Sequence, residues 1–317
     1  MTPDTGPAAQ LPVKLPVKQL LLVLGVVATA YAAALLIWGD TPKTSLSRLW
    51  SAVGLQAAAL CLLSYGLRGL RWKLWMAHYG RHFGWLQGLR LYLAGYAFTP
   101  TPGNVGEAVR GLMLARNPLG TAQSLAIFGA ERLADLLCLL LLCLPALGWL
   151  LRHGAVQASP AWLVGLAVAG VLAAVLLLAT VLYHRQALVQ RFGWLHEAWR
   201  CLAVRPGVWF ALTLAAWAAQ GLAVWLLCRD LEVHLPLLTA TGFYAVAMVA
   251  GALSALPAGL GGTEAVLTGL LVAQSASPGQ ALTITVLARL LTLWLAVALG
   301  VVALLYSAAI RKEISFR

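Results

Sequence analysis

PTPGNVGEAVRGLML at residues 100–114 and PAGLGGTEAVLTGLL at residues 257–271 are two copies of one Pro/Gly-interrupted motif. An offset of 157 residues aligns them and places Glu107 on Glu264, each followed by Ala-Val. Both copies lie inside apolar stretches, where a broken helix leaves backbone groups that lipid cannot satisfy. Such a break must therefore be buried in protein or line a polar cavity.

The composition is that of a membrane protein. Of 317 residues, 61% are hydrophobic and 10% are charged, whereas a soluble domain has about 25% charged residues. Several charge-free runs reach the ~20 residues that a transmembrane helix needs. We expect an all-α polytopic membrane protein with full spans over 19–38, 47–67, 121–150, 161–183, 207–228 and 281–308. The first run could be a signal peptide, but its length favours an uncleaved helix.

The distribution of positive charge predicts the topology. The net charge is +12, and most of the 22 basic residues flank apolar runs, which favours contact with anionic lipid head groups over nucleic acid. If the tails 1–18 and 311–317 are cytoplasmic, 16 of the 22 basic residues fall on the cytoplasmic side and four in the outside loops. Between the tails, 19–310 forms one transmembrane domain. The basic, aromatic segment 68–90 is either an interfacial helix or an ordinary loop.

With this topology, the two interrupted stretches 91–117 and 237–278 enter and leave the membrane on the same side, as re-entrant helical hairpins. The halves 47–150 and 207–308 run in opposite directions. Interrupted segments at matching positions of inverted halves point to a transporter's substrate site. The residues expected at the two tips are Pro100, Pro102, Gly103 and Gly106 in the first hairpin and Pro257, Gly259, Gly261 and Gly262 in the second.

Ionisable residues within the apolar stretches supply the candidate chemistry. Charges there cost roughly 2.5–3.5 kcal/mol each on insertion scales and need partners. The offset of 157 residues also places Arg132 on Arg289, so we expect Glu107 to pair with Arg132 and Glu264 with Arg289. We expect each glutamate to lie in the first turn of the helix that follows its break. The candidate substrate-binding residues are Glu107, Arg110, Glu131, Arg132, Asp135, Glu264 and Arg289.

Two interpretations of this set stay open. It can be a static ion-pair network that fixes the tips to the bundle, or a site for an anionic head group, because the arginine fork suits phosphate. Arg110, three residues after Glu107, fits a surface ion pair near the cytoplasmic end. Glu131 and Asp135 share a helical face beside Arg132.

Other chemistry finds little support in the sequence. Five cysteines form no CxxC pair, and among the six histidines only His78 and His82 have a spacing, i,i+4, that suits a metal, with no acidic residue nearby. We therefore expect no metal site and no cofactor. Nucleotide-binding and hydrolase motifs are missing, which favours a transporter over an enzyme.

The segments PGNVGEAVR at 102–110, ERLAD at 131–135 and LPAGLGGTE at 256–264, with Arg289, resemble the lysylphosphatidylglycerol synthase transmembrane-region family, the flippase-like domain group. The resemblance covers about 20–310. It implies translocation of a lipid, such as an aminoacylated phospholipid, across the bacterial inner membrane. Larger members add a cytosolic aminoacyl-tRNA-dependent transferase, whereas this sequence stops at Arg317, so lysyl transfer is not expected. Pro-Ala-Gly stands at 257–259 where the family pattern leads us to expect Pro-Gly-Gly.

The predicted function is therefore that of a lipid translocase. The expected partners are anionic or aminoacylated phospholipids or polyprenyl-linked lipids, with a second copy of the chain or a neighbouring lipid synthase as further partners. One alternative is a membrane enzyme or accessory subunit of a lipid or lipid-linked-sugar pathway. Another is a scaffold for a lipid synthase.

Overall fold

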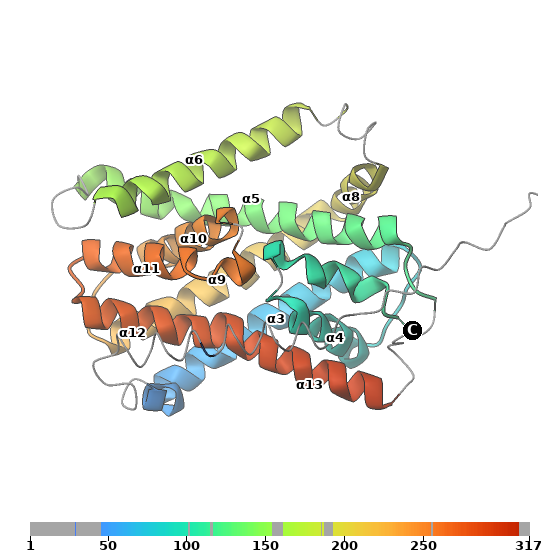
Figure 1. Cartoon of the computed structure of the whole chain (residues 1–317), viewed down its shortest axis with the longest axis horizontal. Coiled ribbons are helices and arrows are strands. Elements are labelled where there is room, and N and C mark those ends of the chain that lie inside the picture. Colours follow the sequence, from blue (N-terminus) through green and yellow to red (C-terminus); the bar gives the residue numbers. More distant parts are fainter. Residues whose placement is uncertain are drawn as a thin grey trace, which may run out of the picture.

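The computed structural model describes residues 46–100, 102–114, 117–153, 161–184, 193–254 and 256–310, with Thr29 and Gln186. Throughout these ranges the regular elements are helices (Figure 1). The first half contains η1 (Arg48–Trp50), α3 (Ala52–His78), α4 (Trp85–Ala94), the 3-10 helices η2 (Gly95–Phe98) and η3 (Pro102–Gly111), and α5 (Thr121–His153). Between the halves lie α6 (Ala161–Tyr183) and α8 (Gly193–Ala203). The second half contains α9 (Pro206–Asp230), α10 (Leu237–Leu253), η4 (Pro257–Gly259), α11 (Gly262–Ala273), α12 (Pro278–Arg289), the π-helical turn η5 (Leu290–Trp294) and α13 (Leu295–Ala309).

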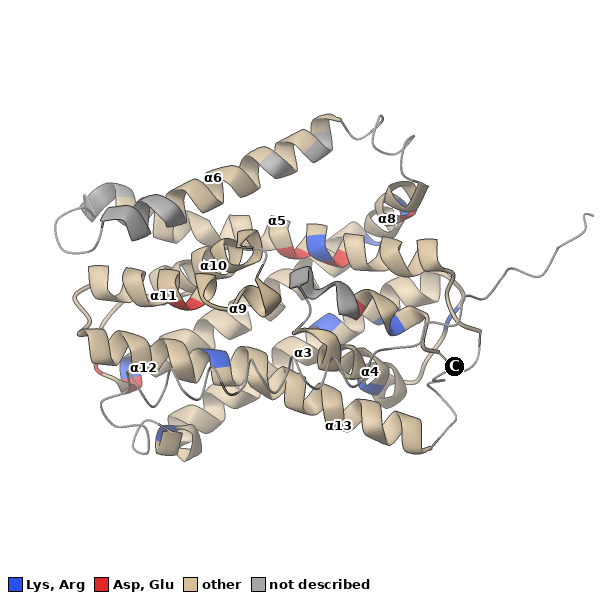
Figure 2. Ribbon diagram, in the orientation of Figure 1, with Lys and Arg blue, Asp and Glu red and all other residues tan. Residues whose placement is uncertain are grey.

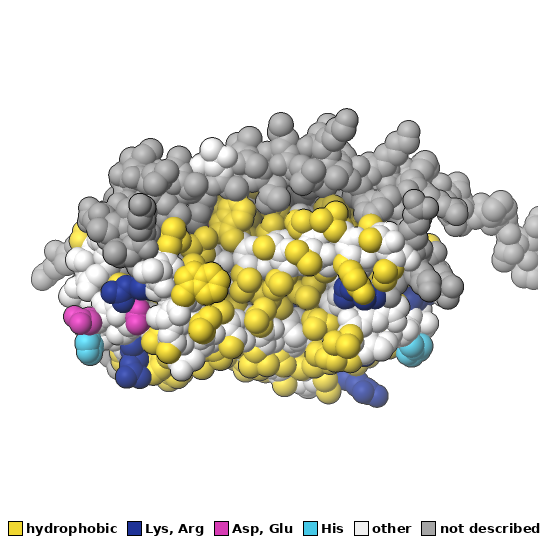
Figure 3. Space-filling model, turned by 90° about the horizontal axis from the view of Figure 1, so that it is seen from below, with side chains coloured by type: hydrophobic (Ala, Val, Ile, Leu, Met, Phe, Trp, Pro, Cys, Tyr) yellow, Lys and Arg dark blue, Asp and Glu magenta, His cyan; other side chains and the backbone are white. Residues whose placement is uncertain are grey.

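Four helices in the described ranges are long and apolar enough to cross a membrane. They are Ala52–His78, Thr121–Leu150, Pro206–Asp230 and Pro278–Ala309. In Figure 3 a broad hydrophobic face lies between two ends that carry the charged and histidine side chains. A surface divided in this way matches a bilayer slab with polar borders. The expected all-α polytopic membrane fold is confirmed, and the expected span 161–183 coincides with α6. The expected span 19–38 falls outside the described residues except for Thr29.

The two halves contain corresponding helices that run in opposite directions. α5 begins at Thr121 and α12 at Pro278, which are 157 residues apart, as the motif offset predicts. α3 and α9 pack antiparallel, since Arg48 beside the start of α3 binds Asp230 at the end of α9, and Arg71 further along α3 reaches Thr213 near the start of α9. This arrangement is the one that an inverted repeat predicts.

Reciprocal packing joins the halves. α5 of the first half packs on α10 of the second, and α13 of the second packs on α4 and η2 of the first. Glycines allow both approaches. A Cβ on Gly242 would lie 2.8 Å from the backbone nitrogen of Ala146, and one on Gly300 would lie 2.7 Å from the carbonyl carbon of Tyr96. Each half therefore completes the packing of the other.

Contacts at the helix ends group the connections into two sets. Arg81, just after α3, donates to the backbone of Asn117 and Pro118, just before α5. At the opposite end of the bundle, Gln280 in the first turn of α12 donates to the Leu231 carbonyl after α9. This grouping agrees with the one that the loop charges predict. Which end faces the cytoplasm stays a prediction.

α3 corrects the expectation for segment 68–90. Residues 68–78 are neither a loop nor an interfacial helix, because α3 continues without interruption to His78. Trp72, Trp75 and Met76 pack in the core, and Arg68 and Arg71 are buried with them. A membrane helix can carry these arginines because other helices, and not lipid, surround them.

The second interrupted segment has the dimensions that a re-entrant hairpin needs. α10 has 17 residues and α11 has 12, or about 25 and 18 Å, less than the ~30 Å hydrocarbon core. Between them the backbone reaches positive φ at Ala258 (54°), Gly259 (67°) and Gly261 (81°). Re-entry into the membrane itself stays a prediction.

The first interrupted segment differs from the expected helical hairpin. After α4 the chain continues through η2 and η3, and an α-helix resumes only at Thr121. Glu107 therefore lies within a 3-10 helix and not in the first turn of an α-helix. η3 packs against η4, so the two interrupted segments meet.

Candidate functional site

A set of seven charged residues, here called the arginine–carboxylate cluster, lies around η3. α3 contributes Arg68 and Arg71, η3 contributes Glu107 and Arg110, and α5 contributes Glu131, Arg132 and Asp135. Figure 2 shows acidic and basic residues alternating in the middle of α5, with further basic residues on the neighbouring helices. All members are buried except Arg132, whose side chain is 36% exposed. The packing of α3, η3 and α5 thus brings charges from distant parts of the sequence into one layer.

Asp135 is neutralised mainly by α3. Its Oδ1 accepts from Arg71 Nη1 at 2.6 Å and from the indole of Trp217 at 3.2 Å. The same Arg71 nitrogen donates to Thr213 Oγ1 at 3.0 Å, while Arg71 Nη2 is 3.9 Å from Glu131. Arg71 thus ties α3, α5 and α9 together.

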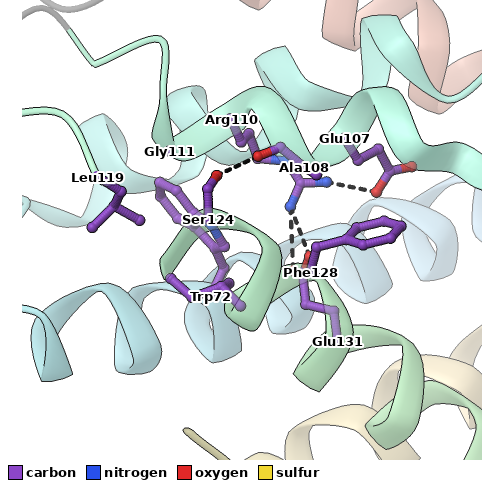
Figure 4. A pocket seen from close by; sticks show the side chains of 10 residues that line it. Trp72, Glu107, Ala108, Arg110, Gly111, Leu119, Ser124, Phe128 and Glu131 are labelled. Atoms are coloured by element: carbon purple, nitrogen blue, oxygen red, sulfur yellow. Dashed lines mark hydrogen bonds and ion pairs between the residues drawn. The ribbon is translucent and has the colours of Figure 1, made fainter. Parts of the chain in front are cut away.

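Arg110 lies between two carboxylates, as Figure 4 shows. Its Nη2 donates to Glu107 Oε2 at 2.6 Å, and its Nη1 donates to both oxygens of Glu131 at 3.2 Å. The other Glu107 oxygen accepts from Thr99 Oγ1 at 2.8 Å. The Tyr92 ring centroid lies 4.5 Å from the guanidinium carbon. Both oxygens of Glu107 therefore have close donors other than Arg132.

Arg132 is held more loosely than Arg110 and Arg71. Its Nη2 is 3.6 Å from Glu107 Oε2 and 3.4 Å from Asp135 Oδ2, beyond ordinary hydrogen-bond length. Its guanidinium carbon is 5.4 Å from the Phe128 ring centroid. Arg132 is consequently the accessible cation of the cluster.

In the second half, Glu264 and Arg289 form a closed pair. Arg289 Nε donates to Glu264 Oε1 at 2.8 Å, and Arg289 Nη2 donates to the Ala258 carbonyl at 2.8 Å. The second oxygen of Glu264 accepts from the Gly261 backbone at 2.8 Å, which places Glu264 at the start of α11 as expected. This pair fixes the strained segment around η4 to α12.

Several predictions about these residues need correction. The Glu264–Arg289 pair is present and Arg132 lies beside Glu107, but Arg110 is buried and not part of a surface ion pair. The main partner of Glu131 is Arg110 and not its neighbour Arg132. Among the tip residues, Pro102, Gly103 and Gly106 lie in η3, although residues 101–106 are outside the described side chains. Pro100 lies in the turn before η3, Pro257 and Gly259 lie in η4, which packs against η3, and Gly261 and Gly262 lie at the start of α11.

Sequence reasoning missed Arg68 and its polar neighbours. Arg68 is buried with its guanidinium carbon 3.9 Å from the Trp217 ring centroid, and it reaches Gln220 Oε1 at 3.4 Å. The same Gln220 oxygen accepts from Tyr244 at 3.0 Å. The side-chain amide of Gln220 inside the apolar helix α9 was the sequence signal that could have identified this group of buried polar residues.

The cluster has a surplus of positive charge and of donors. It contains four arginines and three carboxylates, and Arg68 is the arginine that forms no ion pair within 4 Å in the described structure, whereas Arg132 faces Glu107 and Asp135 at 3.6 and 3.4 Å. Buried N–H groups without an acceptor in the described structure are Arg68 Nε, Arg71 Nε and Nη2, Arg110 Nε and Arg132 Nε. In the same ranges no group of three acidic, histidine or cysteine side chains has metal-site geometry. The arrangement is suited to a small oxyanion.

Comparison with known families assigns the chain. The model of the family described as "Lysylphosphatidylglycerol synthase TM region" matches residues 21–300. The chain belongs to this family. A search of curated proteins finds no match. Membership in the lysylphosphatidylglycerol synthase transmembrane family, together with the four helices of the described ranges that are long and apolar enough to cross a membrane, indicates a multi-pass membrane protein tied to lipid metabolism or translocation.

Proposed function

We propose that this protein is a lipid translocase of the bacterial inner membrane, with cytoplasmic tails, and that the arginine–carboxylate cluster receives the lipid head group in transit. The observation that carries the proposal is the surplus guanidinium charge in a layer where two interrupted segments meet, with Arg132 accessible. An ion-pair network that only holds helices together needs no excess cation. A site that receives an oxyanion needs an excess cation to balance the oxyanion's charge.

The physical problem for a translocase is the cost of placing a charged head group in hydrocarbon. Intramembrane charges cost several kcal/mol unless they are paired or hydrated. Guanidinium groups offer a bidentate fork for phosphate oxygens. The acyl tails stay in the bilayer while the head group passes along the cluster.

A membrane enzyme of lipid metabolism is the rival function. General acid–base chemistry needs a carboxyl group within reach of its substrate. Glu131 and Asp135 are buried and bonded to Arg110 and Arg71, so neither is placed for proton transfer to a bound lipid. This favours translocation.

Reconstitution into liposomes tests the proposal. The full chain is incorporated with fluorescent phosphatidylglycerol, phosphatidylethanolamine or a polyprenyl-linked lipid in one leaflet, and arrival in the other leaflet is followed by chemical quenching. Arg132→Gln is expected to slow movement at least about tenfold, since it removes a charged hydrogen bond of roughly 1.5–3 kcal/mol.

Arg200→Gln is the matched control. Arg200 is exposed and pairs with Glu197 at 3.2 Å on α8, so it has an arginine–glutamate pair at i,i+3 outside the cluster. Movement by this variant should equal wild type. If the wild-type protein moves no lipid of the panel, or if Arg132→Gln moves lipid as fast as wild type, the translocase assignment is wrong.

A further inference from the structure

The repeated glutamate–arginine pair has two different geometries. In the second half, Arg289 and Glu264 are in direct contact at 2.8 Å and Arg289 is buried. In the first half, the corresponding side chains of Arg132 and Glu107 are 3.6 Å apart and Arg132 is 36% exposed. The same two residue types at the same offset are therefore closed in one half and open in the other.

A competing arginine explains the open pair. Arg110 donates to Glu107 Oε2 at 2.6 Å and so occupies the oxygen that Arg132 faces. At the offset of 157 residues, Arg110 corresponds to Leu267, which is buried and has no polar side-chain atom that could compete for Glu264. At the same offset, Glu131, the second partner of Arg110, corresponds to Ala288 in the second half. The first half thus has an inserted ion pair that the second half lacks.

The charge balance identifies the chemical class of ligand. The pair in the second half is neutral, whereas the cluster has one more arginine than carboxylates, and the two carboxylates near Arg132 are bonded more closely, at 2.6 Å, to Arg110 and Arg71. A group with one negative charge and several acceptor oxygens would balance that charge and satisfy guanidinium donors. A lipid phosphodiester has this chemistry. A diphosphate would bring excess negative charge into the layer, and a neutral sugar head group would leave the cation unbalanced.

We infer that the first half holds a site for one lipid phosphodiester at Arg132. Arg110 is a positioning residue, because it holds Glu107 and so keeps Arg132 available. The Glu264–Arg289 pair is a closed structural contact outside this site. This deepens the proposed function and rests on it only for the claim that the bound lipid moves. Binding itself is a separate property.

The test measures binding of dihexanoyl phosphatidylglycerol to the purified full chain in a neutral detergent by isothermal titration calorimetry. The informative variant is Arg110→Leu with Glu131→Ala, which copies the second half. It removes one charge of each sign, so the cluster keeps its surplus cation. Glu107, which loses Arg110, still has Arg132 to pair with. Arg132 should then close on Glu107, and affinity should fall at least about tenfold, as for loss of one charged hydrogen bond.

Rescue distinguishes positioning from a general structural role. Adding Glu107→Gln to the double variant removes the residue that captures Arg132, and binding should return to within about threefold of wild type, less than the effect of one charged hydrogen bond. Adding Glu197→Gln instead, on α8 and outside the cluster, is the matched control. It changes the charge by the same amount but leaves Glu107 in place, so binding should stay weak.

Single variants test the asymmetry. Arg132→Gln should weaken binding at least about tenfold and Arg289→Gln less than about threefold. The inference is overturned if the folded double variant binds as wild type, if Glu107→Gln and Glu197→Gln rescue equally, or if Arg289→Gln weakens binding as much as Arg132→Gln. If the double variant does not fold, the two single variants still decide the assignment.

Liposome transport with the same proteins separates the two claims. Wild-type binding without lipid movement would refute the translocase and leave the site. Lipid movement with wild-type binding by the double variant would refute the positioning role and leave the translocase.

Discussion

At the scale of single residues, Arg71 shows why the membrane interior tolerates so many charges. Its guanidinium group is fully buried, and its partners Asp135 and Thr213 come from two other helices. Removing one member of a buried ion pair leaves an uncompensated charge, which costs roughly 3–5 kcal/mol. The pair is therefore expected to matter for folding and not only for lipid binding.

Arg71→Met tests this expectation. It keeps much of the side-chain volume but leaves Asp135 without its closest cation, so the melting temperature in neutral detergent should fall sharply. Combining it with Asp135→Asn removes the orphaned charge and should recover most of the loss. Near-native stability of the single variant would mean that Asp135 finds another partner.

Predictions about single residues were correct where the internal repeat supplied the spacing between two partners. Glu264 and Arg289 could be paired because their spacing repeats that of Glu107 and Arg132. Arg71 could not be placed, because Arg68, Arg71 and Lys73 together resemble a basic loop. Its carboxylate partner Asp135 is 64 positions away on α5, a distance over which local sequence patterns give no information.

At the scale of elements, close helix contacts depend on glycine. A Cβ on Gly300 of α13 would collide with the backbone of Ala97 and Tyr96 in η2. These are backbone atoms, which cannot rotate away as a flexible side chain can. Gly66 of α3, in contrast, has open space around it, since a Cβ there would meet nothing within 4 Å. The two glycines form a natural comparison.

Gly300→Ala should destabilise the protein by about 1–3 kcal/mol, as overpacking does. Gly66→Ala should be neutral or stabilising by up to ~1 kcal/mol, since alanine favours the helix. Thermal unfolding of both purified variants in the same detergent provides the measurement. Equal stability of the two variants would contradict the close packing of α13 on η2.

The two interrupted segments show which features of the secondary structure could be predicted from the sequence. Their positions followed from proline and glycine, but their conformations did not. GTEAVLTGLL after the second break contains good helix formers and an acidic residue at its start, and it forms α11. In the first copy the equivalent glutamate binds Arg110 and Thr99. It is not left to cap a helix, and the chain stays in a 3-10 helix until Gly111.

At the scale of the whole molecule, the charges at the two ends of the helix bundle define opposite faces of a membrane protein. His82 lies after α3 and His234 after α9, and both are exposed. Because α3 and α9 run antiparallel, these two histidines lie at opposite ends. The basic loops predict that His82 is cytoplasmic and His234 is on the outer side.

His82→Cys and His234→Cys test that orientation in spheroplasts with a membrane-impermeant maleimide. The native background is low, because the five cysteines of the sequence are all buried. We expect Cys at position 234 to react in intact spheroplasts, and Cys at position 82 to react only after lysis, because the excess of positive charge retains its end of the bundle in the cytoplasm. The reverse pattern would invert the topology and, with it, the leaflet from which Arg132 receives its lipid. Labelling of both sites without lysis would contradict the antiparallel arrangement of α3 and α9 in the membrane, on which the inverted repeat depends.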